Sequence, residues 1–279
     1  MTETFRIGGD LEVPRMGFGA MRITGQGVWG WPGDRNAMHT LLHRVVELGV
    51  QLIDTADSYG PETSEYLLAG ALHPYDGLVI ATKGGYERTG PGHWTTNGRP
   101  DHLRMACANS LRRLEVDCID LYQLHVIDDD VPLEESLGAL RELQDEGKIR
   151  YIGVSNFSVE ELERARKVVE VVSVQNRYNL GDREHEAVVD HCTKLGIGFI
   201  PWYPLATGDL NSDERLAAIA AGYGANAGQV ALAWLLQRSP VMLPIPGTSS
   251  LAHLEDNVAA RNLVLSDEDF ASLSEMSAP

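Results

Sequence analysis

The feature that most constrains the fold of this sequence is a regular alternation of short apolar runs with longer amphipathic segments. Eight apolar runs of strand length recur at intervals of roughly 25 to 40 residues. They span residues 15–19, 51–54, 78–83, 119–125, 149–154, 171–175, 196–201 and 242–246. Eight parallel strands with crossover helices favour a closed (β/α)8 TIM barrel, an α/β fold. We expect it to form a single domain over residues 1–279.

The segments between these runs carry apolar residues three and four positions apart, which is the spacing of an amphipathic helix. Several have a plausible N-cap at their start or a glycine at their end. We expect helices at residues 34–48, 101–114, 133–146, 159–168, 184–195, 229–237 and 251–260.

The two ends of the chain depart from this rhythm. Residues 5–7 and 11–13 flank Gly8-Gly9-Asp10, which predicts an N-terminal β-hairpin across the bottom of the barrel. Residues 266–276 predict an extra C-terminal helix with Ser266 as its N-cap.

Charge and cysteine content limit the classes of partner and compartment. With 40 acidic and 23 basic residues the formal charge is −17, which disfavours nucleic acid and membrane surfaces as partners. Any nucleotide site must therefore supply its own local donors. The three cysteines form no C-x-x-C pair, no apolar run reaches the length of a membrane span, and the first residues do not resemble a signal peptide. We expect a cytoplasmic protein.

Ionisable residues stand where three neighbouring apolar runs end. The second run ends in Asp54, the third in Lys83 and the fourth in His125, and Tyr59 follows the second run closely. Active sites of such barrels lie at the carboxyl ends of the strands. Each residue alone is more often structural, but four such types at adjacent strand ends indicate catalysis.

Five motifs carry a resemblance to a known family. They are L-I-D-T-A-D-S-Y-G, A-T-K-G, Y-Q-L-H, G-V-S-N-F and V-Q-N-R-Y-N. In this order they resemble the successive active-site motifs of the aldo-keto reductases. The resemblance implies an NADPH-dependent enzyme that reduces an aldehyde or ketone to an alcohol by hydride transfer.

The resemblance also implies a role for each strand-end residue. Tyr59 is the implied general acid, which protonates the alkoxide left by the hydride. Lys83 would lower the pKa of Tyr59, and Asp54 would hold Lys83 charged and oriented. His125 would hydrogen-bond the substrate carbonyl, with its tautomer open.

Cofactor-binding residues follow from the same resemblance. Ser155, Asn156 and Gln175 resemble the residues that bind the nicotinamide carboxamide. Trp202 stands where the family usually has a tyrosine stacked on the nicotinamide ring, although a plain core aromatic is the alternative reading.

The segment after the eighth run would hold the adenosine phosphate at a helix N-terminus. Its candidate residues are Gly247, Thr248, Ser249, His253 and Asn257. Many family members have an arginine in place of His253, and that arginine clamps the 2′-phosphate. Histidine is a weaker partner, yet NADPH remains favoured over NADH.

Aromatic residues in two loops predict the substrate pocket. Residues 26–33 and 84–98 are expected to lie on the catalytic face, with Trp29 and Trp94 as candidate substrate contacts or as ordinary loop packing. The first loop and the segment before it are similar to a bacterial subgroup that includes pyridoxal reductases. This suggests an aromatic aldehyde such as pyridoxal, with keto-sugars and simple ketones still open, and a monomer as the default.

Four other functions have some basis in the sequence. A G-x-G-x-x-G at residues 25–30 could indicate a Rossmann dehydrogenase, but Trp-Pro-Gly follows where a helix should begin. A Schiff-base aldolase could use Lys83, but would leave Tyr59 without a role. A metal enzyme is disfavoured because His185, His191 and Cys192 lack ligand spacing at strand ends. A reductase-like nicotinamide-binding redox sensor with little turnover remains the alternative.

Overall fold

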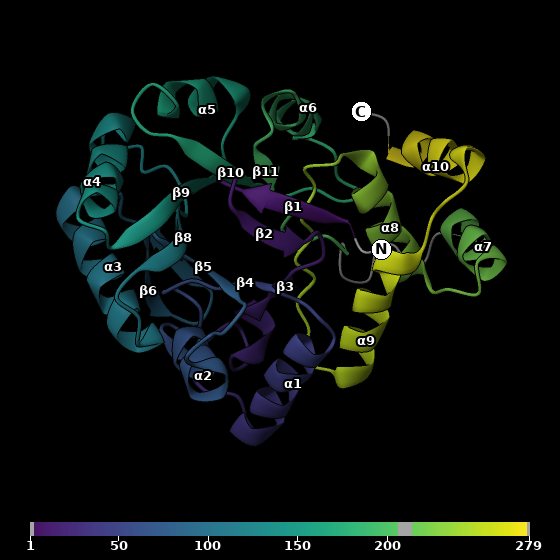
Figure 1. Ribbon diagram of the computed structural model, residues 1–279, viewed down its shortest axis with the longest axis horizontal. Coiled ribbons are helices and arrows are strands. Elements are labelled where there is room, and N and C mark those ends of the chain that lie inside the picture. The colour runs from purple at the N-terminus through teal and green to yellow at the C-terminus, as the bar shows by residue number, and fades with distance from the viewer. Residues whose placement is uncertain (1–2, 206–213, 278–279) are drawn as a thin grey trace.

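A parallel sheet that curls into a barrel forms the centre of the computed structural model, which describes residues 3–205 and 214–277. Seven strands run in the order β11-β10-β9-β8-β5-β4-β3, and each pairs in parallel with its neighbour (Figure 1). They are β3 (Phe18–Gly19), β4 (Leu52–Asp54), β5 (Val79–Gly84), β8 (Ile119–Leu124), β9 (Ile149–Ser155), β10 (Val171–Gln175) and β11 (Gly198–Phe199).

The eighth predicted strand closes the barrel without forming a regular ladder. On one side the backbone N–H of Leu243 donates to the carbonyl oxygen of Phe199 at 2.8 Å. On the other side the N–H of Gly17 donates to the carbonyl oxygen of Pro244 at 2.9 Å. Two of the five residues at 242–246 are prolines, which have no N–H to donate. The predicted (β/α)8 barrel is confirmed, but this strand is reduced to isolated hydrogen bonds.

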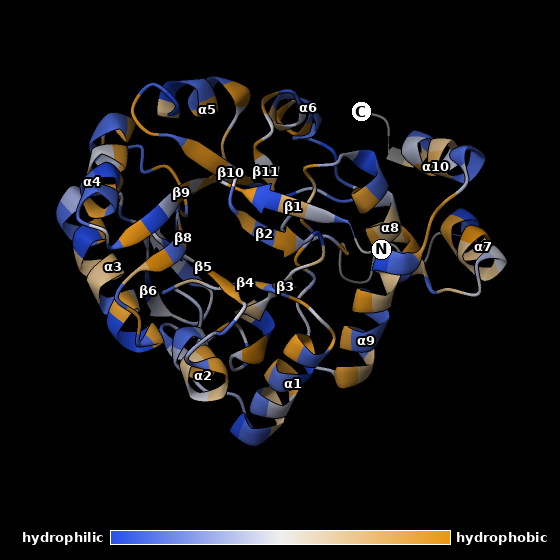
Figure 2. Cartoon of the chain, viewed as in Figure 1, coloured by the Kyte–Doolittle hydropathy of each residue, from blue (hydrophilic) through white to orange (hydrophobic). Residues whose placement is uncertain are grey.

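Helices surround the barrel, and most begin and end where the sequence indicates. In Figure 2 the barrel strands β4, β5 and β10 are mostly orange, whereas the surrounding helices alternate orange with blue hydrophilic residues. Ser158 and Asn226 each complete a capping box, and Gly196 ends its helix in the left-handed conformation. The predicted helices correspond to α1 (Arg35–Glu47), α3 (Pro100–Leu114), α4 (Leu133–Asp145), α5 (Val159–Ala165), α6 (Glu186–Leu195), α8 (Ala227–Arg238) and α9 (Leu251–Ala259).

Two further helices, α2 (Thr63–Leu72) and α7 (Glu214–Gly222), were not predicted. Helix α2 has no side-chain N-cap, since Glu62 before it adopts a left-handed conformation. Helix α7 is rich in alanine, which forms helices readily but gives little contrast between apolar and polar faces. The start signal of α2 and the periodicity of α7 are therefore weak. Short 3-10 turns lie at Ala20–Ile23, Ala260–Asn262 and Glu275–Ser277.

The prediction of a loop at residues 84–98 was wrong in part. Strands β6 (Tyr86–Gly90) and β7 (His93–Thr96) pair in an antiparallel hairpin above the barrel. The turn contains Gly92, with a φ of 74°, and Arg88 lies opposite Trp94 in the register. Neither strand contains a buried residue, so no run of buried residues marks them in the sequence.

Both predicted terminal elements are confirmed. Strands β1 (Thr4–Ile7) and β2 (Leu11–Pro14) form an antiparallel hairpin, drawn in purple across the barrel in Figure 1. Ile7 and Val13 are fully buried against residues at the start of the barrel strands, including Leu52 and Val79. The hairpin therefore covers the amino end of the barrel and leaves the carboxyl end for the site.

The last helix, α10 (Asp267–Ser274), has Ser266 as its N-cap, with the Ser266 side chain accepting from the backbone N–H of Asp269. Within residues 3–205 and 214–277, no helix is both long and apolar enough to span a membrane.

Candidate active site

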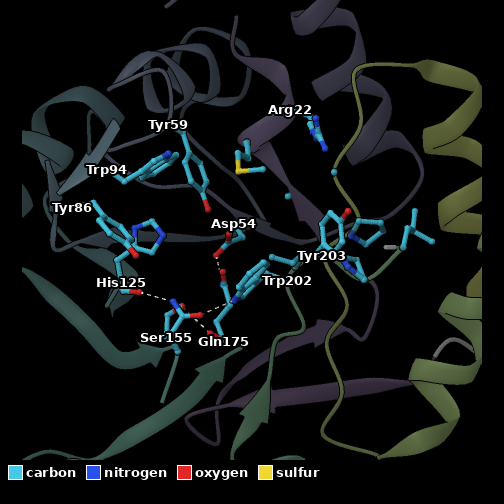
Figure 3. Close-up of a pocket in the computed structure, with 18 residues that line it drawn as sticks. Arg22, Asp54, Tyr59, Tyr86, Trp94, His125, Ser155, Gln175, Trp202 and Tyr203 are labelled. Carbon is cyan, nitrogen blue, oxygen red and sulfur yellow. Dashed lines mark hydrogen bonds between the residues drawn. The ribbon is translucent and has the colours of Figure 1, made fainter. Parts of the chain in front are cut away.

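A cavity of about 450 Å³ opens at the carboxyl ends of the barrel strands. It is lined by residues from six of the seven strands or the segments just after them, together with the β6–β7 hairpin. Tyr86, Trp94 and His125 lie on one side of it, and Trp202 and Tyr203 lie on the other (Figure 3). The candidate site residues that line it are Asp54, Tyr59, Trp94, His125, Ser155, Asn156, Gln175, Trp202 and Gly247.

Lys83 lies beneath the cavity, fully buried, and joins two of the candidate catalytic residues. Its Nζ donates to Oδ1 of Asp54 at 2.6 Å and to the hydroxyl oxygen of Tyr59 at 3.2 Å. A third hydrogen bond, to the backbone oxygen of Thr55 at 2.8 Å, uses the last ammonium proton. The side chains at the ends of β4 and β5 are thus brought together as predicted.

The second carboxylate oxygen of Asp54 accepts two further hydrogen bonds. Nε2 of Gln175 lies at 2.8 Å and Nε2 of Gln123 at 3.0 Å from Oδ2. Gln123 is a residue that the sequence analysis missed. The only signal was a polar residue inside a buried strand, since Gln123 itself is completely buried.

The electrostatics of Lys83 and Tyr59 follow from their burial and contact. Burial lowers the pKa of the Lys83 ammonium, but Asp54 and Tyr59 together outweigh it, and the net shift is upward. Burial also raises the pKa of the Tyr59 phenol, and the positive charge of Lys83 offsets this only in part. Lys83 therefore lowers the pKa of Tyr59 as expected, but the net shift is upward because desolvation of the phenolate is the larger effect. Tyr59 holds its proton.

His125 follows β8 and lies among aromatic rings. The Tyr86 ring meets it edge-on with centroids 4.7 Å apart, and the Tyr59 ring does so at 5.9 Å. Burial, helped by the nearby charge of Lys83, holds the pKa of His125 well below its ordinary 6.5. The imidazole is therefore neutral at physiological pH.

The candidate nicotinamide residues form one hydrogen-bonded wall. Nδ2 of Asn156 donates to the backbone oxygen of His125 at 3.1 Å, and Oδ1 of Asn156 accepts from Nε1 of Trp202 at 2.9 Å. The Ser155 hydroxyl donates to the backbone oxygen of Gln175 at 2.7 Å. Asn156 adopts a left-handed φ of 63°, which asparagine tolerates better than most residues. These contacts fix a polar wall that presents amide and hydroxyl groups to the cavity.

The remaining cofactor candidates extend from the cavity onto α9. Gly247 lines the cavity, and Ser250 caps the helix by accepting from the backbone N–H of His253 at 3.4 Å. An added Cβ at Gly247 would lie 2.6 Å from the backbone oxygen of Gly19, so only glycine fits there. Four candidates lie beyond the cavity wall, on the segment that leads into α9 and along its first two turns: Thr248, Ser249, His253 and Asn257.

The two candidate substrate residues are placed differently. Trp94 lines the cavity, whereas Trp29 does not. The guanidinium carbon of Arg88 lies 3.7 Å from the centroid of the Trp94 ring and 5.5 Å from that of Trp29. Trp29 therefore packs near Arg88 outside the cavity wall, which fits the alternative of ordinary loop packing.

Arg22 is a lining residue that the sequence analysis did not single out. It follows β3 and is the only cationic side chain among the described residues of the cavity wall. Its Cγ lies 3.6 Å from the Cβ position that a side chain would occupy at Gly247. The cavity thus has a local positive charge beside Gly247, on the segment that leads into α9, despite the negative charge of the whole chain.

Comparison with known proteins gives consistent matches over the length of the chain. The model of the aldo/keto reductase family matches residues 15–278. An uncharacterized oxidoreductase of Schizosaccharomyces pombe is 51% identical over 96% of this chain and 88% of its own length. The pyridoxine 4-dehydrogenase of Escherichia coli is 41% identical over 99% of both chains.

A solved structure has the same fold. An aldo-keto reductase from Klebsiella pneumoniae, crystallised in complex with NADPH, has a TM-score of 0.86 and 28% identity. The match covers 100% of this chain and 96% of the other.

Proposed function

The chain belongs to the aldo/keto reductase family, and from this premise we propose that it reduces an aldehyde or ketone to an alcohol with NADPH, Tyr59 donating the proton. The observation that carries the proposal is the contact of Lys83 with both Asp54 and Tyr59 at the floor of the cavity, beside a neutral His125.

The residues around the cavity fit a nicotinamide nucleotide. Ser155, Asn156 and Gln175 offer hydrogen-bonding groups suited to a carboxamide, and Trp202 offers an aromatic face. Arg22 supplies positive charge beside Gly247, where an anionic part of the molecule would enter the N-terminus of α9. When bound, NADPH supplies the hydride that adds to the carbonyl carbon.

The proton step falls to Tyr59. As the carbonyl oxygen gains negative charge, it takes the proton of the Tyr59 hydroxyl, so that the phenol O–H bond breaks and the alcohol O–H bond forms. Lys83, 3.2 Å from the same oxygen, stabilises the phenolate that remains. Asp54 keeps Lys83 charged and in place, and Gln123 and Gln175 hold Asp54. His125 orients the carbonyl oxygen from the side of the cavity.

We propose an aromatic aldehyde such as pyridoxal as the substrate class. Tyr86 and Trp94 meet edge-to-face at 5.4 Å and form an apolar wall beside His125. A flat ring could pack against this wall while its aldehyde reaches Tyr59. The relative at 41% identity is named for pyridoxine, whose oxidation gives an aldehyde of this kind.

We also propose that the enzyme is a single-domain monomer of the cytoplasm. Cys107, Cys118 and Cys192 are all free thiols, which suits a reducing compartment. Light scattering of the purified protein at several concentrations tests the oligomeric state.

The direct test is oxidation of NADPH, followed at 340 nm with pyridoxal, a nitrobenzaldehyde and several ketones. We expect turnover with NADPH, weaker turnover with NADH, and the highest kcat/KM for an aromatic aldehyde. Stoichiometric NADPH binding without turnover on any carbonyl would contradict the reductase and favour the redox sensor.

A further inference from the structure

Ser58 is a buried residue that contacts His125 and that the proposed chemistry leaves without a role. It stands directly before Tyr59 in the loop after β4 and is 2% exposed. Its Oγ lies 3.4 Å from Nδ1 of His125. This is a long hydrogen bond between two neutral groups, so it is weak, but it is the contact that distinguishes the two ring nitrogens.

The direction of this hydrogen bond follows from the partners available to the hydroxyl. Within residues 3–205 and 214–277, Nδ1 of His125 is the only hydrogen-bond partner of the Ser58 hydroxyl. A buried hydroxyl seldom leaves its proton without an acceptor. The hydroxyl therefore donates to Nδ1, and a ring nitrogen that accepts carries no proton in the neutral imidazole. The proton of the ring is then on Nε2.

The other ring nitrogen opens onto the cavity. Nε2 of His125 has no hydrogen-bond partner in the described part of the chain, and this atom is not sealed from solvent. His125 lines the cavity, so Nε2 is the nitrogen that a substrate can reach. Burial holds the pKa of the ring well below 6.5, which keeps a single proton on it.

We propose that Ser58 is a positioning residue that fixes the Nε2–H tautomer of His125, so that the neutral ring donates a hydrogen bond to the substrate carbonyl oxygen. The inference rests on the proposed function for its catalytic meaning, but the tautomer is a property of the protein alone. With the opposite tautomer, Nε2 would be an acceptor facing another acceptor, and the carbonyl would be repelled.

The β6–β7 hairpin holds the backbone of Ser58 in place. Nη1 of Arg88 donates to the backbone oxygen of Ser58 at 2.8 Å, and Nε of Arg88 donates to the backbone oxygen of His93 at 3.1 Å. The guanidinium stacks on Trp94 at 3.7 Å. The β6–β7 hairpin is therefore tied to the loop that carries Ser58 and Tyr59, and its Tyr86 ring packs against His125. The backbone of Ser58 and the ring of His125 are therefore both held by the same hairpin.

The first test is NMR of the wild-type protein without ligands, using 15N-labelled histidine. The signals of His125 are assigned among the nine histidines by their loss in His125→Gln. We expect long-range 1H–15N couplings to show a neutral ring protonated on Nε2. A ring protonated on Nδ1 would overturn the proposal, whatever the activity of the protein.

The second test compares Ser58→Ala with Ser58→Thr, which keeps the hydroxyl. We expect Ser58→Ala to populate both tautomers and to lower kcat about fivefold, the effect of losing one neutral hydrogen bond. The Kd for NADPH should not change, since Ser58 does not line the cavity. Ser58→Thr should recover both the single tautomer and most of the lost kcat. Unchanged kcat and an unchanged tautomer in Ser58→Ala would contradict the role.

These readouts separate this inference from the proposed function. A protein with the Nε2–H tautomer but no activity on any carbonyl would leave the inference about Ser58 standing and remove the reductase. An active reductase with the Nδ1–H tautomer would support the proposed function and overturn the inference about Ser58.

Discussion

Lys83 and Asp54 form an ion pair that is almost completely removed from solvent, with Nζ and Oδ1 2.6 Å apart and side-chain exposures of 0% and 2%. Such a pair offsets the cost of burying its two charges only while both partners are present. In this barrel the pair also touches Tyr59, so the same contact bears on stability and on catalysis.

Removing one member of the pair should destabilise the fold more than removing both. We expect Asp54→Asn or Lys83→Met to lower the free energy of unfolding by about 3 to 5 kcal/mol, because each leaves a buried charge unpaired. The double variant should lose less than either single variant, because it leaves neither charge buried without its partner. Urea denaturation followed by circular dichroism measures all three.

Additive losses in the double variant would show that the two charges do not stabilise each other. As a control, Arg6→Met with Glu12→Gln breaks an exposed ion pair and should change the free energy of unfolding by less than about 1 kcal/mol.

The pH profile of reduction should be flat across a wide range. Burial raises the pKa of Tyr59 above its ordinary 10.0, so the phenol keeps its proton in neutral and mildly alkaline solution. The pKa of His125 lies well below 6.5, so the ring stays neutral until the solution is considerably more acidic. We expect kcat at saturating NADPH and aldehyde to be constant between pH 6.5 and 10.

A fall in kcat centred near pH 6.5 would show that His125 has an ordinary pKa and would contradict its burial among aromatic rings.

The depressed pKa of His125 also predicts how the free energy of unfolding depends on pH. The unfolded ring binds a proton more readily than the folded one, so this contribution to stability is complete above pH 6.5 and is lost as the pH falls toward the folded-state pKa.

The position of His253 predicts a way to strengthen the preference for NADPH. His253 is exposed in the first turn of α9, just beyond Ser250, which caps the helix. An arginine there would offer a bidentate, permanently charged partner to the 2′-phosphate. We expect His253→Arg to raise the ratio of kcat/KM for NADPH over NADH about tenfold, which corresponds to about 1.4 kcal/mol.

His191→Arg is the charge-matched control, since it adds the same group in α6. An equal change in this ratio in both variants would mean that the added positive charge acts at long range, and not through a contact at position 253. No change in His253→Arg would place the 2′-phosphate away from the first turn of α9.

The main architecture and the strand-end residues could be predicted because they depend on local pattern and one general rule. Apolar runs of strand length mark most of the barrel strands, and parallel strands bring their carboxyl ends to one edge. Asp54, Lys83 and the nearby Tyr59 therefore had to meet once the strands were placed. The N-cap at Ser266 is equally local, because it needs only the residues that follow it.

Other features depend on contacts between distant segments and left little trace in the sequence. Gln123 is recognisable as a partner of Asp54 only when β4 and β8 are seen on either side of β5. The β6–β7 hairpin is mostly exposed, so hydrophobic alternation does not reveal it, and without it the positions of Trp29 and Trp94 could not be told apart. The direction of the net pKa shift of Tyr59 depends on how deeply the phenol is buried, which no sequence motif reveals.

The most direct test of the central claim is the turnover of Tyr59→Phe. This change removes the proposed proton donor and leaves the cavity wall in place, so NADPH titrated by fluorescence should bind with an unchanged Kd. Tyr66→Phe removes a phenol hydroxyl from an exposed ring outside the cavity and serves as the matched control. With the best aldehyde of the panel, we predict that kcat falls at least about a hundredfold in Tyr59→Phe and stays at the wild-type value in Tyr66→Phe. A kcat for Tyr59→Phe within about threefold of the wild-type value would contradict the account, because a general acid contributes far more than that.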